Sequence, residues 1–147
     1  MRGASKLKGR GVCNNPIVSI IDDDESVRVA TSSLVRSLGW KARLYESAEQ
    51  FMACGNLCDV TCIISDVQMP GISGIDMYRR LVCQGVQTPI IFISAFASDK
   101  VRKQAFDAGA VCMLSKPVDV SDVTRCLESV RTHTSRASSA QPPAGAR

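Results

Sequence analysis

The chain has 147 residues, of which 45% are hydrophobic and 22% are charged. This length and balance suit one globular domain with its own core, and no apolar run approaches the roughly 20 residues of a membrane-spanning helix. The formal net charge is +4, but residues 1–10 hold four of the basic side chains, and residues 16–131 contain 12 Lys and Arg against 14 Asp and Glu. No apolar segment follows the basic start, which argues against a secretory signal peptide.

Seven cysteines without a signal peptide predict reduced thiols in a cytoplasmic protein. Cys54, Cys58 and Cys62 are spaced by fours, a spacing that could serve a metal site if all three shared a helix. Cys62 falls in a strand-like run, however, and a buried cysteine usually behaves as a small hydrophobic residue. We therefore expect no zinc or iron–sulfur site here.

Short apolar runs alternate five times with helical patterns along the chain. The runs predict strands over 16–21, 42–46, 60–65, 89–94 and 110–115. The helical segments carry their own signals, which are an apolar stripe, a capping residue or a terminal glycine. These signals are a stripe of Val27, Ala30, Leu34 and Leu38 before Gly39, a capping box of Ser47 and Gln50, a Ser73 cap for a helix through Val82, Gly109 after 99–108, and a stripe of Val120, Val123, Leu127 and Val130.

This alternation predicts a doubly wound α/β fold. Three of the strands are apolar on both faces, as expected when helices cover both sides of a parallel sheet. We expect the domain to span 16–131, after a basic, disordered leader over 1–15 and before a disordered Ser/Ala/Pro-rich tail over 132–147. The only histidine, His133, falls in that tail and is interpreted as a solvated residue rather than a catalyst.

Polar side chains stand at the predicted carboxyl ends of four strands. They are Asp22 and Asp23, then Asp66, Ser94 and Lys116. Ligands of open α/β sheets bind at these strand ends. Clustered carboxylates attract a cation such as Mg²⁺, which prefers oxygen ligands, and a carboxylate can accept a phosphoryl group as a nucleophile. A lysine and a hydroxyl can neutralise and hydrogen-bond that group.

Each of these residues has a simpler interpretation when it is taken alone. An acidic residue before a helix is often a cap, and Asp24 is interpreted in that way. A Ser at a strand end or a single Lys-Pro pair carries little information. The combination at the correct strand ends is what predicts a phosphoryl-transfer site.

The chain resembles the receiver domain of two-component response regulators, and its FixJ-type branch most of all. The matching stretches, "VSIIDDDESVR", "IISDVQMPGISGIDM", "IIFISAFAS" and "AFDAGAVCMLSKPVD", lie within residues 16–131. The resemblance implies a five-stranded parallel sheet in the flavodoxin-like order 2-1-3-4-5, with five helices. It also implies Mg²⁺ as the cofactor and a cis peptide bond between Lys116 and Pro117. Such a bond is uncommon even before proline.

The resemblance also assigns roles to individual residues. It makes Asp66 the phosphoacceptor, with Asp22 and Asp23 as the acidic pocket. Asp23, Asp66 and the backbone carbonyl of Gln68 are expected to hold Mg²⁺. Ser94 is the switch hydroxyl, and Lys116 contacts the phosphoryl group.

Two departures from the family pattern affect these expectations. Met113 stands where the family usually has Tyr or Phe, so the aromatic ring that normally couples the switch hydroxyl to the surface is missing. About sixteen residues follow the last predicted helix, too few for a DNA-binding module. The chain is therefore expected to be either a stand-alone receiver or the receiver fragment of a longer DNA-binding regulator.

The sequence thus predicts a signalling module that takes phosphate from a histidine kinase or phosphotransfer protein and then switches its binding to a downstream protein. Its own catalysis would be limited to self-phosphorylation and autodephosphorylation, with no direct contact to nucleic acid or membrane. An aspartyl phosphatase would place a second Asp two residues after the nucleophile, where this chain has Gln68. A flavin-binding protein would need a phosphate loop after the first strand, and "DDDES" has the wrong charge for that role.

Overall fold

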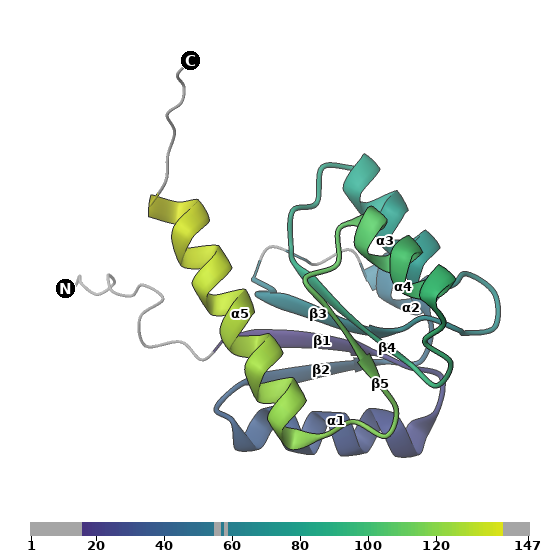
Figure 1. Cartoon of the computed structure of the whole chain (residues 1–147), viewed down its shortest axis with the longest axis horizontal. Helices are drawn as coiled ribbons and strands as arrows, with labels where there is room; N and C mark the ends of the chain where they lie inside the picture. Colours follow the sequence, from purple (N-terminus) through teal and green to yellow (C-terminus); the bar gives the residue numbers. More distant parts are fainter. Residues whose placement is uncertain (1–15, 55–56, 58, 140–147) are drawn as a thin grey trace.

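The computed structural model describes residues 16–54, 57 and 59–139. Within them, five parallel strands form one sheet in the order β2-β1-β3-β4-β5 (Figure 1). This arrangement confirms the predicted doubly wound fold and its strand order. The strands are β1 (Ile17–Ile21), β2 (Lys41–Tyr45), β3 (Cys62–Asp66), β4 (Ile90–Ser94) and β5 (Cys112–Ser115).

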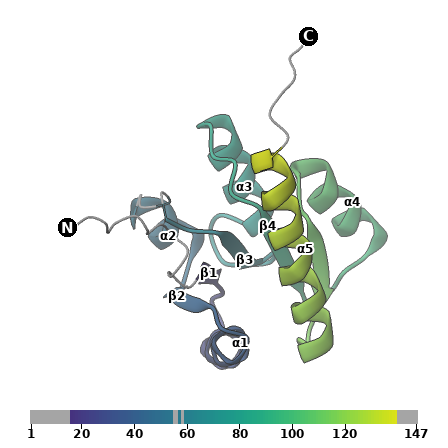
Figure 2. The ribbon, with the colours of Figure 1, turned by 90° about the vertical axis from the view of Figure 1, so that its left-hand side faces the viewer.

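Helices cover both faces of this sheet. Figure 2 shows α1 and α3 on opposite sides, with the strands between them. The helices are α1 (Glu25–Ser37), α2 (Ala48–Cys54), α3 (Gly74–Cys83), α4 (Asp99–Ala108) and α5 (Val120–Ser139). One apolar core lies between the sheet and α2, α3 and α4, and a second lies under α1 and α5. The central strands β3 and β4 are buried at every residue, which explains their continuous apolar runs.

The helix caps largely follow the sequence signals. Asp24, Ser73 and Ser98 accept backbone amides at the starts of α1, α3 and α4, and Gly109 ends α4 with φ of 114°. At α2 the Ser47 hydroxyl accepts the Gln50 amide at 3.0 Å, but the Gln50 side chain accepts the Glu46 amide rather than that of Ser47, so only half of the predicted capping box is formed. Asp24 is therefore a capping residue, as its simpler interpretation predicted.

The buried face of α1 differs from the predicted stripe. Ala30 is exposed, whereas Thr31, Ser32 and Val35 are buried. The polar members of this face are small, and the Ser32 hydroxyl donates to the Val29 carbonyl at 2.8 Å, so its burial leaves no orphaned donor. Leu34 and Leu38 of the predicted stripe are partly buried and pack against the core, so the stripe lies at the edge of the buried face rather than at its centre.

The last helix is longer than the sequence predicted. It continues to Ser139, past the expected domain boundary at 131, so residues 132–139, His133 among them, are helical rather than part of an irregular tail. No glycine or proline interrupts this stretch, and the Thr132 hydroxyl donates back to the Glu128 carbonyl at 3.0 Å. The predicted leader over 1–15 and the end of the tail over 140–147 lie outside the described residues.

The cysteine positions do not support a shared metal site. Cys54 is exposed at the end of α2, Cys62 is fully buried in β3, and Cys58 lies outside the described residues. Burial raises the pKa of the Cys62 thiol above its usual range, which keeps it protonated. Cys62 is therefore a core residue.

Candidate functional site

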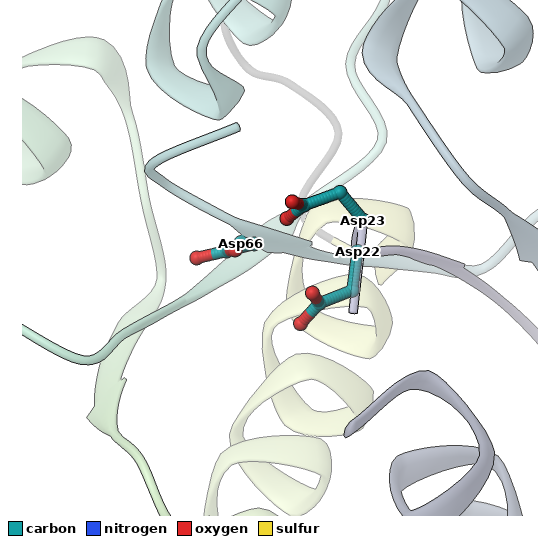
Figure 3. Close-up of side chains that lie close together, drawn as sticks. All are labelled: Asp22, Asp23 and Asp66. Carbon is teal, nitrogen blue, oxygen red and sulfur yellow. The ribbon is translucent and has the colours of Figure 1, made fainter. Parts of the chain in front are cut away.

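Three carboxylates meet at the carboxyl ends of two adjacent strands. Asp66 is the last residue of β3, and Asp22 and Asp23 directly follow β1, which pairs with β3 through Ile21 and Ser65. One oxygen of each carboxylate lies within 4.8 Å of the others, and Figure 3 shows the three side chains gathered at these strand ends. Asp22 and Asp66 are buried, at 2% and 4% exposure, whereas Asp23 is exposed. The structure thus brings together the acidic residues that the sequence predicted.

Lys116 connects two of these carboxylates. It follows β5, and its Nζ lies 3.3 Å from Asp22 Oδ2 and 3.2 Å from Asp66 Oδ2. Burial lowers the pKa of Lys116, but Asp66 and Asp22 together offset that effect and leave its pKa raised. The lysine is therefore held in its charged form at neutral pH.

The pKa of Asp66 is also raised, but for a carboxyl group a raised pKa favours the neutral form. Burial and, after it, the charge of Asp22 raise the pKa of its carboxyl group, Lys116 partly opposes both, and the net result is a pKa of about 6. Asp66 is consequently mostly ionised at pH 7, but at a free-energy cost to the folded state. One lysine does not neutralise three carboxylates.

This charge balance and donor set fit a hard divalent cation. The three groups offer carboxylate oxygens, the ligand type that Mg²⁺ prefers, and they sit beside an exposed edge where bound water can remain. Asp23 takes part in none of the ion pairs among residues 16–132 of the described chain. The expected cofactor is therefore compatible with the residues present.

The Asp22 side chain is fixed by the turn that follows it. Its Oδ1 accepts a hydrogen bond from the Asp24 amide at 2.9 Å. The backbone amide of Asp22 donates to the Tyr45 carbonyl at 3.1 Å. Arg28 from α1 donates to the Asp22 carbonyl at 2.7 Å. Arg28 could not be singled out from the sequence, because one arginine on a helix cannot be told from a solvated surface charge.

The start of α3 packs closely against the Asp66 backbone. The Gly74 amide donates to the Val67 carbonyl at 3.0 Å, and a Cβ placed on Gly74 would lie 2.1 Å from the Asp66 carbonyl oxygen. Glu49 from α2 accepts the Ile72 amide at 3.0 Å. Neither Gly74 nor Glu49 could be identified from the sequence. The tripeptide "SGI" was interpreted only as a helix start, and Glu49 is distant in sequence.

The predicted switch residues belong to β4 and β5, which follow β3 in the order of the sheet. Ser94 is buried at the end of β4, where its hydroxyl donates to the Gln68 side chain at 2.9 Å and accepts the Phe96 amide at 3.1 Å. Met113 is buried in β5 opposite Phe92. The Lys116–Pro117 peptide bond is cis, which agrees with the expectation. The Gln68 backbone carbonyl stays a predicted ligand, and its side chain has a contact that the sequence did not indicate.

A five-stranded 2-1-3-4-5 sheet with an acidic cluster and a lysine at its strand ends defines a receiver-type site. Residues 18–128 match the family model described as the response regulator receiver domain. Since this match spans well over half of the chain, the protein belongs to the receiver domain family of two-component signal transduction.

Several known proteins are similar to the chain. The response regulator protein TmoT of Ectopseudomonas mendocina is 39% identical over 122 residues, covering 79% of this chain and 51% of TmoT. The transcriptional regulatory protein FixJ of Azorhizobium caulinodans is 34% identical over 102 residues, covering 69% of this chain and 48% of FixJ. A crystal structure of FixJ-N is 28% identical, with a TM-score of 0.72 over 81% of this chain and 95% of FixJ-N.

The lengths of these proteins differ from that of the chain. This chain spans about half the length of the curated relatives. Among the described helices, none combines the length and the apolar character needed to cross a membrane.

Proposed function

We propose that the protein is the phosphoacceptor of a histidine-to-aspartate phosphorelay, in which Asp66 receives phosphate from a histidine kinase or phosphotransfer protein in the cytoplasm. The observation that carries this proposal is the meeting of Asp66 with Asp22, Asp23 and Lys116 at one edge of the sheet. Receiver domains are signalling modules, and the chemistry proposed for this chain is limited to its own phosphorylation and dephosphorylation. A downstream protein would respond to the phosphorylated form.

The transfer can be described through the side chains of this chain. A carboxylate oxygen of Asp66 attacks the phosphorus of a phosphohistidine, the phosphorus–nitrogen bond breaks, and the imidazole leaves with its electron pair and takes up a proton. Lys116, already beside Asp66, stabilises the negative charge on the phosphoryl oxygens. Asp23, Asp66 and the Gln68 carbonyl would hold Mg²⁺ next to Asp22. When bound, this ion supplies further charge neutralisation.

Phosphorylation with a small-molecule donor tests this proposal. Acetyl phosphate with Mg²⁺ is expected to add one phosphoryl group per chain, measured by intact mass, with peptide mapping that places it on Asp66. Asp66→Asn should show no labelling, and Asp23→Ala should lose labelling while keeping its circular dichroism spectrum. Equal labelling of Asp66→Asn would refute the assignment, and steady phosphate release from external esters would favour a phosphatase instead.

A second candidate concerns the size of the natural protein. The curated relatives are about twice as long as this chain, and one of them is described as a transcriptional regulatory protein. The chain is then the receiver part of a longer DNA-binding regulator. Reading the coding frame beyond residue 147 distinguishes the two candidates, and both keep the same chemistry at Asp66.

Because Met113 replaces the usual aromatic residue, we expect phosphorylation to shift the balance between the two conformations only in part. Met113 fills the buried site in β5 with a flexible side chain, which defines its position less sharply than a ring would. We expect beryllofluoride, a phosphoryl mimic, to shift the amide signals of residues 94–120 only part of the way, in fast exchange, with a coupling free energy of about 1–3 kcal/mol. Met113→Tyr should make the shift more complete. A complete shift that Met113→Tyr does not alter would contradict this prediction.

A further inference from the structure

The Ser94 hydroxyl is fully engaged in hydrogen bonds. It is completely buried, accepts the Phe96 amide at 3.1 Å and donates its proton to the side-chain carbonyl oxygen of Gln68 at 2.9 Å. A serine hydroxyl has a single proton to donate. In this arrangement Ser94 therefore cannot donate to a second acceptor.

The backbone places Gln68 just after the end of β3, beside the end of β4, where Ser94 lies. Asp66, the last residue of β3, pairs with Ile93 of β4, and the Val67 amide donates to the Ile93 carbonyl at 3.0 Å. Gln68 follows in the loop after β3 and is exposed, whereas Ser94 ends β4 and is buried. Since both strand ends are held by the sheet, the contact depends mainly on the Gln68 side chain.

A phosphoryl group on Asp66 would require the proton that Gln68 now accepts. We infer that the Gln68 side chain is a positioning residue that holds Ser94 in the unphosphorylated arrangement, and that it competes directly with the phosphoryl oxygens for the hydroxyl proton. The inference rests on the proposed function, because it concerns the response of Ser94 to phosphorylation. It assigns Gln68 a regulatory side chain in addition to its predicted backbone ligand.

The hydrogen bond from the Phe96 amide to Ser94 links the position of the hydroxyl to the surface of the protein. The Phe96 amide belongs to the loop between β4 and α4, and the Phe96 side chain is 76% exposed. If Ser94 turns toward Asp66, its oxygen leaves the Phe96 amide, and this loop loses one of its anchors. The Gln68 contact thereby stabilises the unphosphorylated position of an exposed aromatic residue.

Gln68→Met tests the inference, because it keeps the length of the side chain and the backbone carbonyl but removes the acceptor. In the untreated protein, amide hydrogen exchange at Phe96 should be faster in this variant, since the Ser94 oxygen is no longer held in place. With Mg²⁺, beryllofluoride should bind about fivefold more tightly, the factor expected for one neutral hydrogen bond. Gln87→Met, at another exposed glutamine, is the matched control and should change neither quantity.

Gln68→Met in a Ser94→Ala background shows whether Gln68 acts through the Ser94 hydroxyl or directly on the phosphoryl site. There Gln68→Met should have no effect on beryllofluoride affinity, because the competing hydroxyl is absent. An equal gain in beryllofluoride affinity in both backgrounds would overturn the inference, since Gln68 would then act on the site without Ser94. Unchanged Phe96 amide exchange and unchanged beryllofluoride affinity in the Gln68→Met single variant would also overturn it. Failure of the unmodified protein to bind beryllofluoride would overturn the proposed function, while the Phe96 exchange rate would still decide whether Gln68 holds Ser94.

Discussion

Asp66→Asn is expected to stabilise the metal-free protein at pH 7 by about 3 kcal/mol. The Asp66 carboxyl is 4% exposed and lies beside Asp22, and burial together with that neighbouring charge raises its pKa to about 6. An amide of the same shape removes one of three clustered negative charges, and Lys116 keeps its contact with Asp22. The measurement is urea unfolding with and without Mg²⁺, and added Mg²⁺ should stabilise only the unmodified protein.

The pH dependence of this gain follows from the direction of the pKa shift. The folded protein holds the Asp66 proton up to about pH 6, whereas an unfolded chain releases it near its ordinary value of 3.8. Folding stability therefore falls as the pH rises between about 4 and 6, and Asp66→Asn removes this slope. The two proteins should be equally stable near pH 4 and differ fully at pH 7. Asp107→Asn, in an exposed ion pair with Lys103, should show no such difference. A loss of stability in Asp66→Asn at pH 7 would contradict the predicted repulsion.

The fold could be predicted from the sequence because its signals are local. Continuous apolar runs predicted buried parallel strands, and Ser73 and Gly109 predicted where helices begin and end. The acidic cluster could be predicted as well, since parallel strands bring their carboxyl ends to one edge of the sheet. Asp22, Asp23 and Asp66 therefore meet although 43 positions separate the second from the third.

The contacts that position the cluster could not be predicted in the same way. Glu49, Arg28 and the Gln68 side chain act through hydrogen bonds between residues that are distant in sequence or share no periodicity. The buried face of α1 was predicted only in part, because Thr31 and Ser32 are polar and a stripe of hydrophobic residues does not include them. Such features depend on tertiary packing, which apolar periodicity does not encode.

Gly74→Ala is expected to destabilise the protein by about 3 kcal/mol and to lower the rate of phosphorylation by about tenfold or more. Its new Cβ would lie 2.1 Å from the Asp66 carbonyl oxygen and 2.8 Å from the Ser65 hydroxyl oxygen, well inside contact distance. The nearest atom belongs to the backbone of a buried strand, so it cannot move aside as a flexible side chain could. The start of α3 or the end of β3 must shift, and Asp66 moves with the latter.

Gly39→Ala separates this steric effect from the general cost of replacing a glycine. Gly39 has a φ of +95° and nothing within 4 Å of the added Cβ, so alanine there should cost about 1–2 kcal/mol through its left-handed conformation alone. That variant lies at the end of α1, away from the cluster, and should accept phosphate at the normal rate. Chemical denaturation and acetyl phosphate kinetics on both variants provide the comparison. If Gly74→Ala were no more costly than Gly39→Ala and were phosphorylated normally, the close packing of α3 on the Asp66 backbone would not be what positions the phosphoacceptor.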